Sequence, residues 1–351
     1  MAETELSDLV KLELSLLKWC FKGLKIPENK ASRLIEESSN HLEALRRHKI
    51  DSLLYIGCSL DSLAQRVYDK VWKSQREALL TLIELLLERG ISPIIFKGAE
   101  FLATSYHPHA ICLNNDVDLL VEVHELGTVK KVLYNMDYSQ SLFDPDLGKL
   151  IDRDVQEVGN FEASGYELVA FNRMEEVVLE SDELEFARTW QSHPLWVVND
   201  RGIVVTTFDV HYGVAYDVKG EEFFPRAVSS ALGVGRAMSA ADHLWFTTSR
   251  FYNEVAVNDK NSLRDFAYIA SLLSTAQIDW DTVVGAASKY DLRPSLYYYF
   301  AFMNMMGGGV PDDVLQELLP SKGSRHRDWG WQLSKLFGLT DPYPLAEYHT
   351  P

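Results

Sequence analysis

Residues 94–100 read IIFKGAE and residues 114–121 read NNDVDLLV, and these two stretches decide the fold. Each contains a short apolar run, so we expect two strands, the first ending in a Lys-Gly turn before a helix and loop. Successive side chains of a strand point to opposite faces, which places Asp116 and Asp118 together on one face. The other face suits a core and would carry Val117, Leu119, Val121 and Val123.

Two neighbouring carboxylates repel each other and both stay ionised at low cost only when a cation lies between them. The pair Asp116 and Asp118 therefore indicates a Mg²⁺ site. Lys97 and Gly98 lie in the turn, where an ammonium group can reach a phosphate and a glycine lets the backbone approach an anion. The alternative interpretation of Lys97 is an exposed lysine in an ordinary turn.

A third acidic strand is expected at residues 203–212, which read IVVTTFDVHY. Alternation places Thr207, Asp209 and His211 on one face of this strand. If the strand lies beside that of Asp116, three carboxylates converge, as in two-metal phosphoryl or nucleotidyl transfer. His211 would tune Asp209, contact a phosphate or act as a base, or would simply be hydrogen-bonded at the strand end.

The whole pattern is Lys-Gly, a Tyr, Asp-hydrophobic-Asp-Leu-Leu-Val, a helix, and later Asp-hydrophobic-His-aromatic. It resembles the uncharacterised nucleotidyltransferase family of the DNA polymerase β-like superfamily and is distantly similar to aminoglycoside nucleotidyltransferases. The resemblance covers residues 87–311 and is most specific over residues 97–121.

The resemblance implies an α/β (α+β) fold with a polymerase β-like palm, a mixed sheet and helical regions on either side. Apolar stripes at helical spacing before residue 90 and after residue 239 agree with helices there. We therefore expect an N-terminal helical region at 1–90, a nucleotidyltransferase palm at 91–235, and a C-terminal helical bundle and tail at 236–351.

The resemblance also implies the roles of individual residues. The catalytic carboxylates that bind two Mg²⁺ ions would be Asp116, Asp118 and Asp209. The nucleoside triphosphate (NTP) would contact Lys97, Gly98 and His211, together with a basic residue of the C-terminal helices. The candidates for that basic residue are Arg250, Lys260 and Arg264.

Two departures affect the phosphate side of the predicted site. Where the family carries an Arg-x-x-Gly-Asp stretch, this chain has Cys112 at the Arg position and Asn115 at the Gly position. The Gly-Ser phosphate-binding turn of the wider superfamily is also replaced by Lys97-Gly98. These changes leave open an altered donor, an altered acceptor or a weakened enzyme.

The formal net charge of the 351-residue chain is −17, which argues against nucleic acid as a partner, because Lys and Arg on phosphates drive that binding. The three cysteines, Cys20, Cys58 and Cys112, form neither a disulfide framework nor a zinc pattern. The acidic N-terminus does not read as a signal peptide, and no apolar stretch is long enough to span a membrane. We therefore expect a cytoplasmic protein without a membrane partner.

The function predicted from these features is Mg²⁺-dependent transfer of a nucleoside monophosphate (NMP) from an NTP such as ATP, with release of pyrophosphate. The acceptor would be a small molecule, a peptide or a protein, as in specialised-metabolite biosynthesis. The alternatives are a nucleotidyltransferase-like binding module or antitoxin with weak or no catalysis, and a phosphohydrolase that uses the same metals.

Overall fold

The computed structural model describes residues 7–258 and 262–320. Its contacts separate two compact units: one is Asp61–Ser239, and the other joins Met1–Leu60 to Ala240–Pro351. The chain therefore enters and leaves the first unit once, and segments from both ends of the sequence share the second. These bounds differ from the expected division at 1–90, 91–235 and 236–351, which stays a prediction.

The unit at Asp61–Ser239 is built on a seven-stranded mixed sheet. Its strand order is β10-β11-β1-β2-β7-β5, and β6 pairs with the first half of β7. The β1–β11 and β2–β7 pairs are parallel, and the other pairs are antiparallel. The strands are β1 (Ile94–Phe96), β2 (Val117–Leu120), β5 (Phe171–Val177), β6 (Leu195–Val198), β7 (Arg201–His211), β10 (Val228–Ser229) and β11 (Arg236–Ala237).

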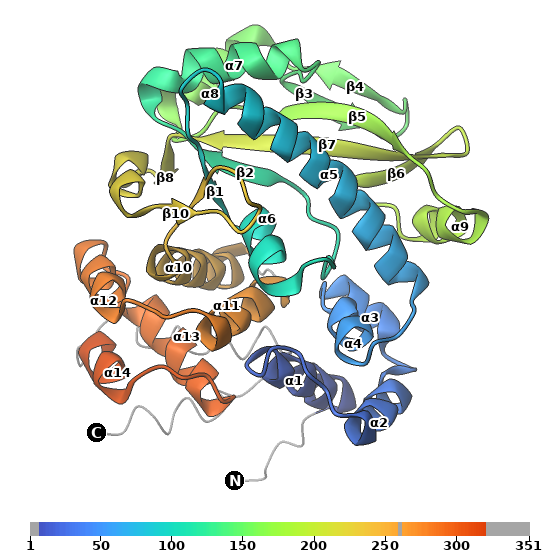
Figure 1. Cartoon of the computed structure of the whole chain (residues 1–351), viewed down its shortest axis with the longest axis vertical. Coiled ribbons are helices and arrows are strands. Elements are labelled where there is room, and N and C mark those ends of the chain that lie inside the picture. The colour runs from blue at the N-terminus through green and yellow to red at the C-terminus, as the bar shows by residue number, and fades with distance from the viewer. Residues whose placement is uncertain (1–6, 259–261, 321–351) are drawn as a thin grey trace. The chain divides into compact units, whose positions relative to one another are not determined.

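Helices cover one face of this sheet. The long α5 (Leu63–Leu87) crosses it and packs on β5 and β7 (Figure 1). It ends before Gly90, whose φ of +77° suits a glycine, and Pro93 prevents its continuation. The other helices of the unit are α6 (Gly98–Phe101), α7 (Leu126–Asn135), α8 (Val155–Ser164), α9 (Ser181–Thr189), the π-helical turn Leu102–Tyr106 and three short 3₁₀ turns at Val123–Glu125, Gly220–Glu222 and Phe224–Arg226.

The alternation along β7 separates the core from the opposite face. Val67 and Val71 of α5 lie in one apolar cluster with Val204 of β7 and Leu195 of β6. Because strand side chains alternate, the residues that share a face with Val204 include Phe208 and Val210, whereas Asp209 points to the face away from α5. The sheet, the helical flanks and the mixed strand order confirm the expected α/β fold class and are consistent with a nucleotidyltransferase fold.

Two short hairpins complete this unit, β3 (Ser141–Asp144) with β4 (Lys149–Asp152) and β8 (Gly213–Ala215) with β9 (Val218–Lys219). At the end of β3 the Asp144 carboxylate accepts from the backbone N–H groups of Asp146 and Leu147, at 2.9 and 3.0 Å. The Asp154 side chain accepts from two N–H groups at the start of α8. These acidic residues therefore close a turn and cap a helix.

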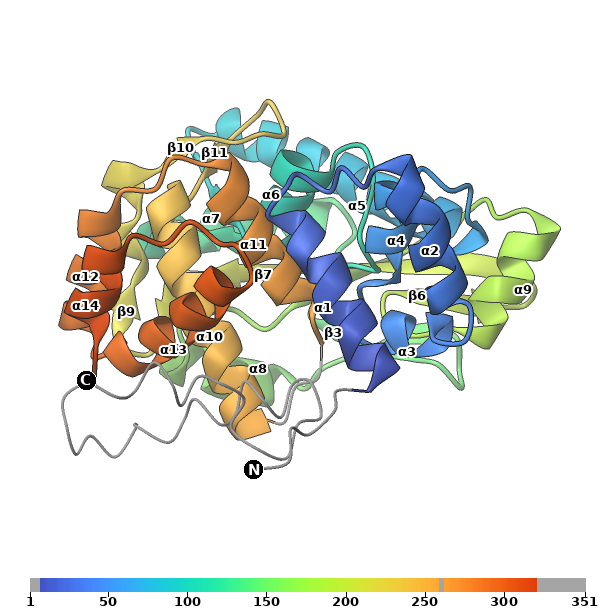
Figure 2. The same cartoon turned by 90° about the horizontal axis from the view of Figure 1, so that it is seen from below.

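The second unit is all-helical among its described residues. In it α1 lies against α11, and α10 packs on α11, α12 and α13 (Figure 2). The backbone N–H of Leu263 donates to the carbonyl of His48 at 2.9 Å and so links its two chain segments. Its helices are α1 (Asp8–Cys20), α2 (Glu28–Ser38), α3 (Leu42–Arg47), α4 (Asp51–Gly57), α10 (Ala240–Asn258), α11 (Arg264–Thr275), α12 (Trp280–Lys289), α13 (Arg293–Met305) and α14 (Asp312–Leu318).

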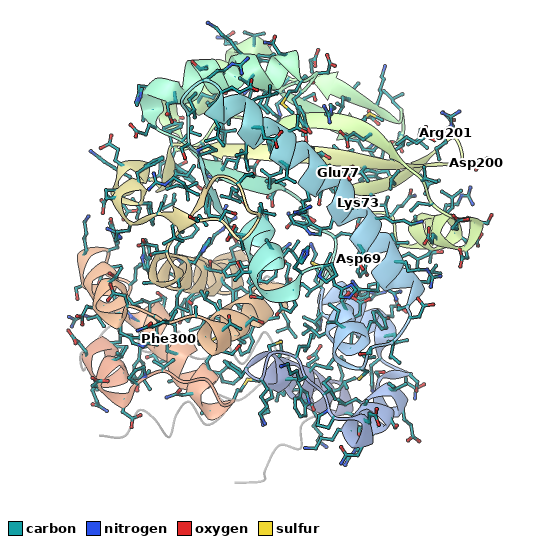
Figure 3. The ribbon with its side chains drawn as sticks, viewed as in Figure 1. Asp69, Lys73, Glu77, Asp200, Arg201 and Phe300 are labelled. Atoms are coloured by element: carbon teal, nitrogen blue, oxygen red, sulfur yellow. The ribbon has the colours of Figure 1, made fainter. Side chains whose placement is uncertain are left out.

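Aromatic packing fills the core of this helical unit. Phe300, labelled on α13 in Figure 3, meets Trp280 of α12 with ring centroids 5.9 Å apart. Trp245 of α10 stacks on Tyr290 at 5.6 Å. Rings of this size bury much apolar surface, so these contacts hold α10, α12 and α13 together.

Candidate active site

The register of three neighbouring strands assembles the site. In the parallel pair of β2 and β7, Asp118 is the direct partner of Asp209. In the antiparallel pair of β1 and β2, Phe96 is the partner of Asp118. Directly paired residues project from the same face, so Asp118 and Asp209 lie side by side on the face away from α5.

Asp118, Asp209 and His211 form a group that could hold a metal ion. Each offers one ligand atom, and these three atoms all lie within 4.8 Å of one another. The side chains of Asp118 and His211 are buried, with 2% and 4% of their surfaces exposed. Two carboxylates and one imidazole are a donor set that divalent metals accept, so the residues fit a metal site.

Asp116 precedes β2 and is partly exposed. It is not a member of the metal-binding group found among the described residues. Its charge nevertheless acts on Asp209 and raises the pKa of that carboxyl group. The structure therefore places Asp116 near the pair, at the more open end of the strand.

The pKa of Asp209 is raised to about 8, and the largest cause is burial. The negative charges of Asp116 and Asp118 raise it further, and the ammonium group of Lys97 lowers it. A carboxyl group that is costly to ionise among its neighbours gains most from a bound cation. The electrostatics of the metal-free site therefore favour cation binding.

His211 has contacts on both ring nitrogens. Its Nε2 lies 3.0 Å from Asp118 Oδ1, and its Nδ1 lies 3.0 Å from Glu167 Oε2, within ion-pair distance but without hydrogen-bond geometry. Tyr166 stacks on the ring at 6.1 Å, and Phe96 meets it edge-on at 5.1 Å. Burial and the nearby charge of Lys97 lower the pKa of His211.

Lys97 lies at the end of β1 and its ammonium group pairs with Asp118 Oδ1. The same group lies 4.9 Å from the centroid of the Phe96 ring. The backbone of Lys97 has φ +58° and ψ −137°, a conformation that favours glycine and is strained for other residues. Packing and the ion pair thus hold this lysine at the carboxylates, whereas its predicted contact with a triphosphate stays a prediction.

A comparison with known protein families matches residues 36–308 to a family described as an uncharacterised nucleotidyltransferase. The chain belongs to this family. The match covers most of the chain and agrees with the family that the sequence pattern resembles. No curated protein and no solved structure matches the chain.

The turn at Gly98 packs closely against the segment that leads into β2. A Cβ atom at Gly98 would lie 2.3 Å from Asn114 Oδ1, so only glycine leaves room for that side chain. Asn114 Nδ2 donates to the backbone carbonyl of Asp116, and Gln75 of α5 donates to the carbonyl of Asn114 at 2.8 Å. Gly98 therefore helps to position the segment that leads into β2, beside its predicted role at an anion.

Cys112 and Asn115, which replace the Arg and Gly of the Arg-x-x-Gly-Asp stretch, lie in this same segment. Cys112 is buried, with 4% of its surface exposed. The carbonyl of Asn115 accepts from Nε2 of His193 at 2.8 Å, and that nitrogen also lies 3.2 Å from Thr207 Oγ1. His193 thus holds the loop before Asp116, in agreement with a structural role.

The basic residues expected at the triphosphate belong to the helical unit. Arg264 pairs with Asp265 at 3.2 Å and lies over the ring of Tyr268, and Arg250 pairs with Glu254 at 2.7 Å. Lys260 lies outside the described residues. The proposed contact of any of the three with an NTP stays a prediction.

His107 and His109 are not members of the metal-binding group of the described chain. His109 Nδ1 lies 2.8 Å from Asp69 Oδ2 on α5, and the other oxygen of Asp69 accepts from the backbone of Ala110. Asp69 begins a row along α5 that continues with Lys73 and Glu77 (Figure 3). His109 therefore anchors the link between β1 and β2 to α5.

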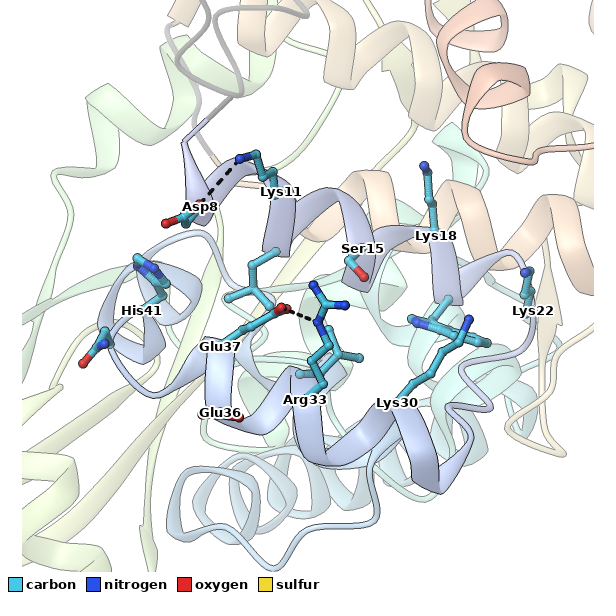
Figure 4. A pocket seen from close by; sticks show the side chains of 14 residues that line it. Asp8, Lys11, Ser15, Lys18, Lys22, Lys30, Arg33, Glu36, Glu37 and His41 are labelled. Carbon is cyan, nitrogen blue, oxygen red and sulfur yellow. Dashed lines mark hydrogen bonds and ion pairs between the residues drawn. The ribbon is translucent and has the colours of Figure 1, made fainter. Parts of the chain in front are cut away.

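A groove of about 890 Å³ lies elsewhere, between α1 and α2 of the helical unit (Figure 4). Its walls carry five lysine and arginine side chains, and two ion pairs lie along them, Lys11 with Asp8 within α1 and Arg33 with Glu37 within α2. None of its lining residues belongs to the metal-binding group. The volume of the groove alone does not make it the catalytic site.

Two residues of the site escaped the sequence analysis. Glu167 and Tyr166 lie in residues 166–171, which read YELVAF and indicate a strand, but no motif linked them to His211. The only signal was alternation, which would put Glu167 on the face opposite Leu168.

None of the described helices combines the length and apolar character needed to cross a membrane.

Proposed function

We propose that the protein is a metal-dependent nucleotidyltransferase that transfers an NMP from an NTP to a small molecule, a peptide or a protein. The acceptor would attack through a hydroxyl, amine, carboxylate or phosphorus acid group. A bond forms between the acceptor and the α-phosphorus, the bond to the leaving group breaks, pyrophosphate departs and the proton of the acceptor passes to water. The observation that supports this most is the direct pairing of Asp118 with Asp209 on neighbouring strands.

The carboxylates of this chain have distinct roles in the proposal. Asp116 and Asp118 would hold the two divalent ions, and Asp209 would hold the ion near the acceptor. When bound, such ions neutralise the triphosphate and stabilise charge at the α-phosphorus. Lys97, Gly98 and a basic residue of the helical unit would contact the phosphates.

The charge of the chain supports a non-nucleic-acid acceptor. A net charge of −17 repels a polyanion, and nucleic-acid binding depends on many Lys and Arg contacts with phosphates. A single NTP with its metal ions carries far less negative charge. The setting we propose is modification of a small molecule or peptide in a biosynthetic reaction.

A nucleotide-binding module or antitoxin with little catalysis is the second candidate. The substitution of Cys112 and Asn115 for the Arg and Gly of the family pattern favours it. The ion pair between Lys97 and Asp118 also favours it, because it offsets part of the negative charge of the site without a metal. Against it stands the partly buried carboxyl group of Asp209 beside that of Asp118, an arrangement that is costly without a cation.

The test is incubation with each NTP, Mg²⁺ and cell extract, followed by mass analysis for NMP-modified products. Asp118→Asn and Asp209→Asn should abolish any product. Asp200→Asn is the matched control, because Asp200 is exposed at the β6–β7 turn (Figure 3) and pairs there with Arg188. NTP binding without product would favour the binding module, and release of phosphate without NMP transfer would indicate a phosphohydrolase.

A further inference from the structure

We infer that His211 is a direct metal ligand beside Asp118 and Asp209, that Glu167 orients its ring, and that this position takes a first-row transition ion such as Mn²⁺ in preference to Mg²⁺. The inference rests on the proposed function, since it concerns the ion near the acceptor. It adds a nitrogen ligand, a positioning residue and a class of metal to that site.

The spacing of the three side chains fits a single ion. Metal–oxygen and metal–nitrogen bonds of about 2.1 to 2.3 Å place the ligand atoms around one ion about 3 to 4.6 Å apart. The ligand atoms of Asp118, Asp209 and His211 lie within 4.8 Å of one another. Small side-chain adjustments therefore suffice to close the site on an ion.

The surroundings of His211 match those of a metal-bound imidazole. A histidine that binds a metal through one nitrogen usually donates its other N–H to a carboxylate, which fixes the ring and its tautomer. Here Nε2 faces Asp118, and Nδ1 lies 3.0 Å from Glu167 Oε2. The ring is buried between Phe96 and Tyr166, whereas the Glu167 side chain is 27% exposed and has room to complete its hydrogen bond.

The same contacts argue against His211 as a base that receives the acceptor's proton. Such a base needs a ring nitrogen that faces the acceptor. Both nitrogens of His211 already face carboxylates, and only 4% of the side chain is exposed. A metal ion bound to Nε2 in place of the contact with Asp118 would keep both ring nitrogens occupied. Direct transfer of the acceptor's proton to His211 would instead require one nitrogen to leave its carboxylate.

The donor set decides the class of metal. Mg²⁺ prefers oxygen ligands and keeps several waters, whereas imidazole nitrogen shifts preference towards first-row transition ions. Asp116 is outside the group that contains His211. The ion that accompanies the nucleotide would therefore be bound by carboxylate oxygens of Asp116 and Asp118 alone, which suits Mg²⁺. The two proposed ions thus differ in kind as well as in place.

The test is a Mn²⁺ titration followed by electron paramagnetic resonance, with pulsed measurements that detect directly bound imidazole nitrogen. We expect a nitrogen coupling in the wild type that changes when histidine is labelled with ¹⁵N, which requires no substitution. His211→Gln should lose the coupling and bind Mn²⁺ more than tenfold more weakly, with Mg²⁺ affinity changed far less. Glu167→Gln should keep the coupling but weaken Mn²⁺ binding about 10- to 100-fold.

His124→Gln is the matched control. His124 also pairs with a glutamate, Glu122 at 3.2 Å, but its side chain is 75% exposed, so its replacement should leave Mn²⁺ binding and the coupling unchanged. Mn²⁺ that binds without a nitrogen coupling would overturn the inference and leave the proposed function standing. Failure to bind either Mn²⁺ or Mg²⁺ in the presence of a non-hydrolysable NTP analogue would overturn both.

Discussion

Asp118 and Asp209 are direct partners in the parallel pair of β2 and β7, and their carboxyl groups project from the same face of the sheet. Burial raises the pKa of Asp209 to about 8, and the negative charges of Asp116 and Asp118 add to the rise. Lys97 offsets part of this charge through its contact with Asp118. A strand pairing of a few residues thus creates a site whose preferred occupant is a cation.

Asp118→Asn should remove nucleotidyl transfer almost completely. The amide keeps the shape of the side chain but loses the charge that both proposed ions and Lys97 contact. The loss in turnover should exceed the 10- to 100-fold that is typical for the loss of an outer-shell partner of a metal. The measurement is product formation under saturating NTP, and a variant that keeps most of the wild-type rate would contradict the metal role.

Asp209 should make the metal-free protein less stable as the pH rises. Its pKa is about 8 when folded against 3.8 for the ordinary group, so between these values the folded state binds a proton that the unfolded state lacks. The free energy of unfolding should therefore fall by on the order of a few kcal/mol between about pH 4 and about pH 8. Above that pH it should level off. Urea unfolding at a series of pH values, with a chelator present, measures this slope.

Asp209→Asn should flatten that slope and raise the stability of the metal-free protein at pH 8. The exposed control Asp200→Asn should keep the wild-type slope. Saturating metal should also reduce the slope, because a bound cation stabilises the ionised carboxylate. An unchanged slope in Asp209→Asn would show that another group carries the pH dependence.

Particular residues show how far the sequence could predict this site. Alternation in residues 117–121 predicted which face of that strand carries Asp118, and alternation in residues 203–212 put Asp209 and His211 together on one face of the other strand. Such a period of two is a local property of the sequence. Pairing of β2 with β7 is a long-range contact, and only the family resemblance indicated it. Fold class was therefore predictable, whereas the contact of Glu167 with His211 was not.

Glu167 was missed for a different reason. The apolar run 168–171 indicated a strand over residues 166–171, but β5 begins only at Phe171. Before it, Glu167 forms an isolated bridge with His211, and Leu168 N donates to Val210 O at 2.8 Å. No local pattern reveals that a residue just outside a strand will face a histidine more than 40 positions later.

Lys97 combines an ammonium group with backbone strain, and two substitutions separate these effects. Lys97→Ala and Lys97→Gly should both weaken NTP binding about tenfold, because a loss of this size corresponds to one hydrogen bond from a charged group. The effect of both substitutions should be smaller at high salt. Lys97→Gly should be about 1 kcal/mol more stable than Lys97→Ala, because glycine accepts the φ of +58°. Equal NTP affinity in all three proteins would move the phosphate contact to the helical unit.

Gly98→Ala should disturb the segment before Asp116. The new Cβ would meet Asn114 Oδ1 at 2.3 Å, so Asn114 must move and its contact with the Asp116 carbonyl is lost. We expect a loss of about 1 to 3 kcal/mol in stability and reduced turnover. Thermal unfolding and NTP turnover measure both effects.

Asn114→Gly in the Gly98→Ala background should recover part of the stability, since it removes the clash. Gly127→Ala is the control, because a Cβ there meets nothing within 4 Å. Its stability should be unchanged or slightly higher, as alanine favours a helix more than glycine. Absence of rescue by Asn114→Gly would place the effect of Gly98→Ala in the turn itself.

Cys112 offers the sharpest distinction between an enzyme and a binding module. An arginine in its place could pair with a carboxylate or phosphate through two parallel hydrogen bonds, which a thiol cannot do. Only 4% of Cys112 is exposed, however, so Cys112→Arg must place a long cation in a packed position. We expect a stability loss of more than about 3 kcal/mol and lower turnover, whereas the small replacement Cys112→Ser should change both far less.

Lower turnover of Cys112→Arg is expected if Lys97 or another cation already supplies the positive charge that the family pattern has at position 112. Turnover of wild type, Cys112→Arg and Cys112→Ser should be compared side by side with the acceptor identified by mass analysis. NTP affinity should be measured on the same samples at a temperature where all three are folded. A gain in NTP binding or turnover in Cys112→Arg would show that the wild-type site lacks a needed cation, and the weakly catalytic binding module would then be the better description.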